Sequence, residues 1–180
     1  MNTDEMISEL DRNHFKMLRE NVRNLIKSAA EHHDKNNLLV LDIAPQDHAG
    51  VREFFQKAQV KTFDINPMSN ADIIGDICKL NVQIADSTFD FIVCTEVLEH
   101  TLDPFSAINE LYRILKPGGI LLASTPLNFR IHGPLPDCWR FTIHGLKHML
   151  RNFSSVEITE YQSFDNRFLM PLQYGIHAVK

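Results

Sequence analysis

The chain has 180 residues, of which 44% are hydrophobic and 23% are charged, values typical of a soluble globular domain with a sizeable core. Its net charge of −5, with basic residues scattered along the chain, argues against a nucleic-acid partner. The first residues lack the apolar stretch of a signal peptide, and no apolar run approaches the roughly 20 residues that span a bilayer, so we expect a cytoplasmic protein without a membrane span.

The first predicted elements alternate between helix and strand. Apolar residues three or four apart between residues 5 and 33 predict one long amphipathic helix or two short ones. The segment LLVLDIA (38–44) is typical of a buried strand. The patterns then predict a helix at 51–58, a strand at 60–66, a short strand at 71–77 and a strand at 89–97.

The second half of the chain continues this alternation. Asp103 can cap a helix that begins at Pro104, because proline at the first helical position loses no hydrogen bond. KPGG (116–119) ends this helix, and ILLAST (120–125) follows as a fifth strand. After irregular residues at 126–138 the patterns predict a last helix near 141–153 and a closing strand pair at 156–164 and 172–179.

Strands that alternate with helices predict right-handed crossovers and a mostly parallel sheet. We therefore expect a Rossmann-like, doubly wound α/β fold with seven strands and an antiparallel C-terminal strand pair. Residues 1–180 form one predicted domain, with a helical cap at 1–36 and an α/β core at 37–180. The N-terminal helix could close over a ligand or simply cover the sheet. In such folds ligands bind beyond the carboxyl ends of the strands.

Acidic residues stand at the ends of the first three strands. Asp64 follows Asp42 by 22 residues, the spacing at which an acid can accept both ribose hydroxyls of an adenine nucleoside. Asp76 could accept a hydrogen bond from the adenine amino group, with Ile77 covering the ring. Asp64 or Asp76 alone could instead form a turn, but three acids at successive strand ends favour a nucleoside site.

The loop after the first strand discriminates between adenine cofactors. Its glycine slots hold Ala44, Gln46 and Ala49, and Asp47 would face the phosphates of a dinucleotide. These residues disfavour NAD and FAD. S-adenosylmethionine carries a sulfonium cation and no phosphate, so an acidic loop suits it, and Ala44 and Pro45 would pass beside its methionine arm.

Two segments carry a family resemblance. FDFIVCTEVLEHTLDP and INELYRILKPGGILLASTP resemble the class I S-adenosylmethionine-dependent methyltransferases of the type 11 kind, over roughly residues 38–153. HGPLPDCWRFTIHGL resembles a subset with an H-x-x-P-x-D-x-W-R-F-T signature, many of which are thought to act on sugars or cell-surface glycans.

The resemblance implies roles for individual residues. Asp42 would anchor the first loop and the methionine amino group. The other implied cofactor-binding residues are Asp64 at the ribose with Ile65 next to it, Asp76 and Ile77 at the adenine, and Cys94, Thr95 and Glu96 at the methionine end. The family's first loop reads D-x-G-x-G-x-G, and this chain has Ala44, Gln46 and His48 at the glycine positions. Gln46 and His48 could narrow the pocket.

Because the sulfonium is already activated, the protein mainly has to position the methyl acceptor and its base. His132 is our first candidate for that base and His100 the second, although either ring could instead order its own loop. Asp137 could orient His132 or bind an acceptor hydroxyl. The other candidate substrate-binding residues are Arg130 and Arg140, which could grip an anionic acceptor, and Trp139, which could stack on a sugar or pack on the last helix.

Metal and thiol chemistry find little support. His144 and His148 lie four residues apart on a predicted helix, but no HExxH pattern and no Cys/His cluster completes a site, so we expect no metal. Cys94 is expected in the core, and all three cysteines are expected to be reduced.

The leading hypothesis is a methyltransferase for a small molecule or glycan, most simply an O-methyltransferase. The alternative is a non-catalytic relative that keeps the fold as a binding or scaffolding module, which the glycine-poor first loop would favour. The acceptor and the oligomeric state stay open.

Overall fold

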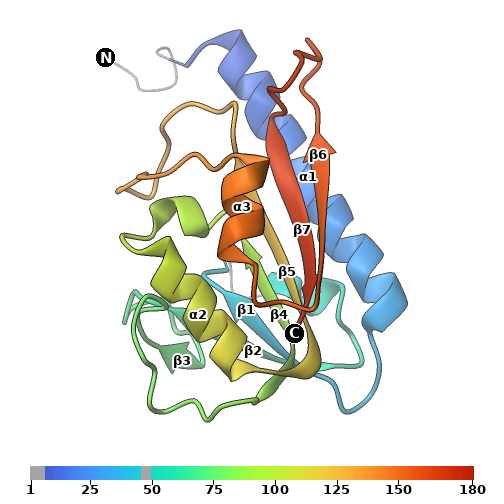
Figure 1. Ribbon diagram of the computed structural model, residues 1–180, viewed down its shortest axis with the longest axis vertical. Helices are drawn as coiled ribbons and strands as arrows, with labels where there is room; N and C mark the ends of the chain where they lie inside the picture. Colours follow the sequence, from blue (N-terminus) through green and yellow to red (C-terminus); the bar gives the residue numbers. More distant parts are fainter. Residues whose placement is uncertain (1–6, 46–49) are drawn as a thin grey trace.

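A computed structural model of the protein describes residues 7–45 and 50–180 (Figure 1). Its seven-stranded sheet has the order β3-β2-β1-β4-β5-β7-β6. The strands are β1 (Leu39–Ile43), β2 (Gln59–Asp64), β3 (Ile73–Ile74), β4 (Phe89–Thr95), β5 (Leu115–Pro126), β6 (Ser155–Tyr161) and β7 (Gln173–Val179). The first five pair in parallel, whereas β7 runs antiparallel to both β5 and β6. The predicted fold class is confirmed, and the strand order reverses between β1 and β4.

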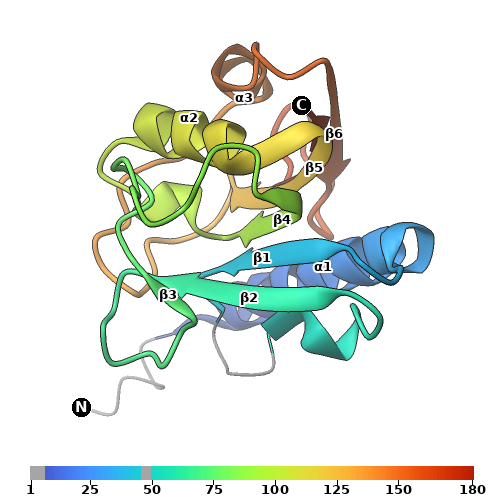
Figure 2. The same cartoon turned by 90° about the horizontal axis from the view of Figure 1, so that it is seen from below.

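Helices cover both faces of the sheet (Figure 2). On one face α1 (Glu9–His33) packs Ile26, Ala29 and Ala30 into a core with β1 and β4. On the other face lie α2 (Pro104–Ile114) and α3 (Ile143–Met149). The predicted N-terminal helix is thus a single helix that covers the sheet. Within the part of the chain that is described, none of the helices combines the length and apolarity needed to cross a bilayer.

The helix predicted at 51–58 is wrong. The structure has only a short 3-10 helix, η2 (Gly50–Glu53), followed by a turn into β2. The carboxylate of Asp34 accepts hydrogen bonds from the amides of Gln56, Lys57 and Ala58. These amides would otherwise donate to carbonyls four residues earlier, so a side chain distant in sequence stops the helix.

The helix predicted from Asp103 is confirmed. The Asp103 side chain accepts from the amide of Ser106, Pro104 occupies the first turn, and the helix ends at Ile114, just before KPGG. KPGG itself lies within β5, where the register with β4 shifts, and Gly118 has a φ of +74°. Glycine tolerates that left-handed conformation, so the strand can bulge between Leu115, which pairs with Phe89, and Ile120, which pairs with Phe91.

A buried ion pair holds α2 to the loop before β4. Glu110 accepts from two guanidinium nitrogens of Arg113 and from the amide of Asn81. Burial opposes ionisation of Glu110, but the bonds from Arg113 and Asn81 outweigh it and lower the pKa of this carboxyl.

We therefore expect Glu110→Gln to lower the free energy of unfolding by about 2 kcal/mol at pH 7, the range for hydrogen bonds to charged groups. Because the folded-state pKa is depressed below the ordinary 4.5, the stabilisation is complete above that pH. It is lost as the pH falls through the folded-state pKa. Urea unfolding of both proteins at pH 7 and near pH 3.5 checks this, and a gap that widens in acid would contradict it.

Candidate active site

The acids at the ends of β1 and β2 differ in their exposure and in their hydrogen bonds. Asp42 is 5% exposed, and its Oδ2 accepts from the Val51 amide at 2.9 Å, so it ties the first loop to η2. Asp64 is partly exposed, and its Oδ1 accepts from the amide of Asn66 at 2.7 Å. Its Oδ2 has no hydrogen-bond partner among the described residues, as a ribose-binding carboxylate requires. Beside it Ile65 is 67% exposed and offers apolar surface.

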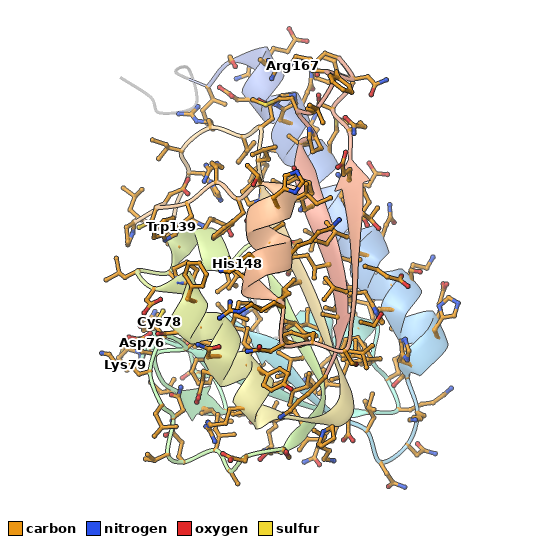
Figure 3. All side chains as sticks on the ribbon, viewed as in Figure 1. Asp76, Cys78, Lys79, Trp139, His148 and Arg167 are labelled. Carbon is orange, nitrogen blue, oxygen red and sulfur yellow. The ribbon has the colours of Figure 1, made fainter. Side chains whose placement is uncertain are left out.

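The third acid, Asp76, lies in the loop after β3, beside Cys78 and Lys79 (Figure 3). Its Oδ1 accepts from the Cys78 amide, and its Oδ2 lies 3.3 Å from Nζ of Lys79. Lys79 is 77% exposed and can move away from an incoming ligand. Ile77 is buried in the core below the loop, so it supports this part of the candidate site from beneath.

The first loop has a strained entry and a glycine whose role the sequence reasoning missed. Ala44 has a φ of +52°, a conformation that favours glycine, and Pro45 follows it. Gln46, Asp47, His48 and Ala49 lie outside the described residues. At Gly50, whose φ is +48°, an added Cβ would stand 2.3 Å from the Asp42 Oδ2 and 3.2 Å from Pro45. Gly50 thus lets the chain pass close to the Asp42 carboxylate.

The left-handed conformation of Ala44 predicts that glycine at Ala44 and glycine at a control position change the free energy of unfolding in opposite directions. We expect Ala44→Gly to raise the free energy of unfolding by about 0.5–1 kcal/mol, because relief of left-handed strain exceeds the extra entropy of glycine in the unfolded chain. Ala85, exposed and without a positive φ, is the control, and Ala85→Gly should lower stability by a similar amount. Chemical denaturation measures both. A loss of stability in Ala44→Gly would remove the assignment of strain.

At the end of β4 the chain turns into the site. Cys94 is fully buried, and burial strongly raises the pKa of its thiol, which confirms its place in the core. Thr95 ends the strand, and Glu96 follows with a φ of +54°. One Glu96 oxygen accepts from Ser124 on β5 and from Gln173 on β7. Burial raises the pKa of Glu96 to about 7, so a carboxyl that can change its charge near neutral pH lies at the switch point.

A second buried acid lies one turn further on, in η3 (Leu98–His100). Glu99 is 0% exposed, and neither of its oxygens has a hydrogen-bond partner among the described residues. Its Oε1 lies 3.8 Å from Nε2 of His100 and 3.7 Å from Nε2 of His132. Burial, and then the neighbouring Glu96, raise the pKa of Glu99 well above its ordinary value.

The segment after β5 folds back onto η3. The amides of Cys138 and Trp139 donate to the Glu99 carbonyl, and the Trp139 indole donates to the carbonyl of Thr101. Trp139 also stacks near Phe141, with ring centroids 6.3 Å apart, and is 40% exposed. It therefore packs ahead of the last helix and still presents a ring face to solvent.

Asp137 organises this segment. Its side chain is 0% exposed, and its two oxygens accept from two Arg140 nitrogens at 2.5 and 2.8 Å. Its Oδ2 also accepts from the His132 amide and lies 3.0 Å from the His132 Nδ1. Burial opposes its ionisation, but the bonds from Arg140 and His132 lower the pKa of Asp137 to about 2. Of its two predicted roles, the contacts favour orienting His132.

The two arginines that were predicted to bind an anionic acceptor already contact other groups of the chain. Arg140 also donates to the carbonyls of Arg130, Trp139 and Phe129, so its guanidinium holds the loop together. Arg130 lies 3.3 Å from Asp11 and links the segment to α1. His132 itself is half-buried, and burial lowers the pKa of its ring, so the ring is neutral near pH 7.

The structure thus brings together Glu96, Glu99, His100, His132 and Asp137 directly beyond β4 and β5. The LEH motif points to Glu99, but only the folded chain shows that it faces two histidines. Two surface indentations of about 390 and 200 Å³ lie elsewhere, near the starts of the strands, and neither is lined by the strand-end acids. The functional groups therefore gather at the carboxyl edge, on both sides of the switch point between β1 and β4.

Comparison with known proteins agrees with this geometry. A family model described as "Methyltransferase domain", of type 11, matches residues 22–123. The ubiquinone biosynthesis O-methyltransferase of Alkalilimnicola ehrlichii is 39% identical over 72 residues, which cover 38% of this chain and 27% of that relative. The match thus spans about a quarter of the length of such curated relatives.

Two solved structures share the fold. A SAM-dependent methyltransferase from Archaeoglobus fulgidus has a TM-score of 0.63 and 18% identity, covering 88% of this chain and 94% of that one. The 1,6-didemethyltoxoflavin-N1-methyltransferase of Burkholderia thailandensis, solved with bound 1,6-didemethyltoxoflavin and S-adenosylhomocysteine, has a TM-score of 0.64 and 14% identity, and the match covers 88% of this chain and 77% of that one. Because the family model covers more than half of the chain, this protein belongs to the methyltransferase domain family of type 11.

Proposed function

We propose that the chain is an S-adenosylmethionine-dependent methyltransferase that transfers a methyl group to a hydroxyl of a small molecule. The observation that carries this proposal is that two groups of polar residues lie on opposite sides of the switch point, at the carboxyl edge of the sheet. The strand-end acids of β1, β2 and the loop after β3 lie on one side of the switch point, and the Glu–His cluster lies on the other. A nucleoside and an acceptor can therefore meet above β1 and β4.

Several described contacts support the cofactor. S-adenosylmethionine, when bound, supplies an activated methyl group on a positively charged sulfur. The unpartnered Oδ2 of Asp64 can accept from the ribose, and the exposed Ile65 can flank the adenine ring. Asp42 holds the first loop, and the buried carboxyl of Glu96 can lie beside the cationic sulfur end. Asp64 and Ile65 suit any adenine nucleoside, whereas the carboxylates of Asp42 and Glu96 suit a cation without phosphates.

The transfer needs an acceptor oxygen in line with the methyl group. The oxygen's lone pair forms the new bond to carbon, the carbon–sulfur bond breaks toward sulfur, and the hydroxyl proton leaves to a base or solvent. His132 is neutral near pH 7, and Asp137 accepts from its backbone amide and lies 3.0 Å from its Nδ1, so the ring can take that proton. Asp137 and Arg140 are positioning residues in this scheme.

A small-molecule hydroxyl is favoured as acceptor because the curated relatives that match this chain are named ubiquinone biosynthesis O-methyltransferases. A glycan is the second candidate, favoured by the exposed ring face of Trp139. The glycan-associated signature matches incompletely, however, since Leu135 stands where that signature has proline, between Pro134 and Pro136.

The experiment is an acceptor screen with S-adenosylmethionine, in which chromatography measures formation of S-adenosylhomocysteine. Phenols and catechols are compared with free sugars and oligosaccharides. We expect turnover with phenolic hydroxyls that falls at least about 100-fold in His132→Ala, the lower end of the range for loss of a base. Turnover with saccharides alone would select the glycan acceptor, and cofactor binding without turnover of any acceptor would favour a binding or scaffolding module.

A further inference from the structure

Three side chains beyond β4 have the arrangement of a metal site. Ligand atoms of Glu99, His100 and His132 all lie within 4.8 Å of one another. Each histidine presents Nε2 to the same Glu99 oxygen, at 3.8 and 3.7 Å. Metal bonds of about 2.0–2.2 Å place ligand atoms around one ion roughly 3–4.4 Å apart. A shift of a few tenths of an ångström would bring all three groups into contact with one ion.

The far nitrogen of each ring lies beside an oxygen atom, as is usual for metal-binding histidines. Nδ1 of His100 lies 3.0 Å from the Pro136 carbonyl. A carbonyl can only accept, so this Nδ1 carries the hydrogen and Nε2 carries the lone pair. Nδ1 of His132 makes no hydrogen bond among the described residues but lies 3.0 Å from the carboxylate of Asp137, which Arg140 holds in place. Such outer partners fix the ring orientation and raise the basicity of the ligating nitrogen.

The glutamate between the rings also lacks another partner. Glu99 is 0% exposed, and both of its oxygens are without a hydrogen-bond partner within residues 7–45 and 50–180. The same holds for Oε2 of neighbouring Glu96. Buried carboxyl oxygens are almost always hydrogen-bonded or bound to a cation. A bound cation explains why this chain buries two acids and two histidines together.

We propose that Glu99, His100 and His132 bind one divalent first-row transition-metal ion. Two imidazoles and a carboxylate suit Mn²⁺, Co²⁺ or Zn²⁺, whereas Mg²⁺ and Ca²⁺ prefer oxygen ligands. This inference departs from the absence of a metal expected from the sequence. The sequence places His132 more than 30 residues from Glu99, so no local motif joins them.

The metal site gives the proposed function a way to activate the acceptor hydroxyl. Three protein ligands leave coordination positions for an acceptor hydroxyl, whose pKa falls when its oxygen binds the ion. The hydroxyl proton then leaves to solvent, and the oxygen attacks the methyl carbon as described above. With the ion bound, His100 and His132 would be ligands, and solvent would take the proton that the proposed function otherwise assigns to His132. This part rests on the proposed function, whereas metal binding itself does not.

Mn²⁺ titration of the full chain tests the site without any cofactor. After treatment with EDTA and dialysis, electron paramagnetic resonance measures free Mn²⁺ as protein is added. We expect one Mn²⁺ per chain, displaced by Zn²⁺ because Zn²⁺ binds such sites more tightly, and unaffected by equimolar Mg²⁺. Glu99→Gln should weaken Mn²⁺ binding at least tenfold. Absence of saturable binding to the unmodified chain would overturn the proposal.

The matched control removes a different pair of histidines, which lie one helical turn apart. His144 and His148 are exposed and four residues apart on α3 (Figure 3 labels His148). The double variant His144→Asn/His148→Asn should keep full Mn²⁺ affinity, and loss of binding in that variant would place the ion elsewhere. If Glu99→Gln does not fold, as judged by circular dichroism, His100→Asn replaces it. Binding of S-adenosylhomocysteine to the same proteins is measured separately, so loss of the cofactor site and loss of the metal site are distinguishable.

Discussion

Replacing Asp64 with alanine is expected to weaken the binding of S-adenosylhomocysteine at least about 100-fold, because two hydrogen bonds to a charged group, each about 1.5–3 kcal/mol, are lost. The Oδ2 of Asp64 has no partner among the described residues, and Oδ1 holds only the Asn66 amide. Both ribose hydroxyls can therefore reach this carboxylate. Isothermal titration calorimetry of the variant and the unmodified chain measures the ratio directly.

The control for Asp64 removes an exposed carboxylate away from the carboxyl edge. Glu31 lies near the end of α1, before β1 begins, and its side chain is 61% exposed. Glu31→Ala should leave the affinity for S-adenosylhomocysteine unchanged. An equal affinity in Asp64→Ala and the unmodified chain would remove the assignment of Asp64 to the ribose.

The second large effect concerns Asp137. We expect Asp137→Asn to lower the free energy of unfolding by about 3 kcal/mol, since breaking a buried ion pair leaves the other charge uncompensated. Asp137 is the group on which Arg140 and the His132 amide converge. For a domain of this size the loss corresponds to a fall in Tm of roughly 6–12 °C. Differential scanning calorimetry measures it.

An exposed Asp–Arg pair provides the comparison. Asp165 lies 3.2 Å from Arg167, and their side chains are 38% and 51% exposed. Arg167 lies at the end of the molecule far from Asp76 (Figure 3). Surface pairs of this kind contribute about 0–1 kcal/mol, so Asp165→Asn should cost much less than Asp137→Asn. Equal losses in the two variants would contradict the structural role of Asp137.

Local patterns predicted most of the fold because burial on one face repeats with a fixed period. The strands and α2 follow from apolar periodicity and from the Asp103–Pro104 helix start. The missing helix at 51–58 depends instead on Asp34, whose carboxylate reaches amides more than 20 residues away. A contact of this kind has no signature in the residues that it changes.

The candidate site, like the fold, could be predicted from the sequence only in part. The strand-end acids could be identified from the sequence because each directly follows its own strand. The Glu99 cluster could not, because it forms only when the segment after β5 returns to η3 through the amides of Cys138 and Trp139. The sequence singled out His132 and Asp137 as neighbours, but it could not show that a buried glutamate lies between His132 and His100.

The most direct test of this account is a titration of the ¹⁵N-labelled chain with S-adenosylhomocysteine, followed by amide chemical shifts. We expect saturable changes at residues 42–45, 64–66, 76–77 and 94–97, which surround the switch point, and no changes near Asp90 and Lys116 at the starts of β4 and β5. Absence of saturable shifts at millimolar ligand, or shifts confined to the starts of the strands, would contradict a cofactor site at the carboxyl edge.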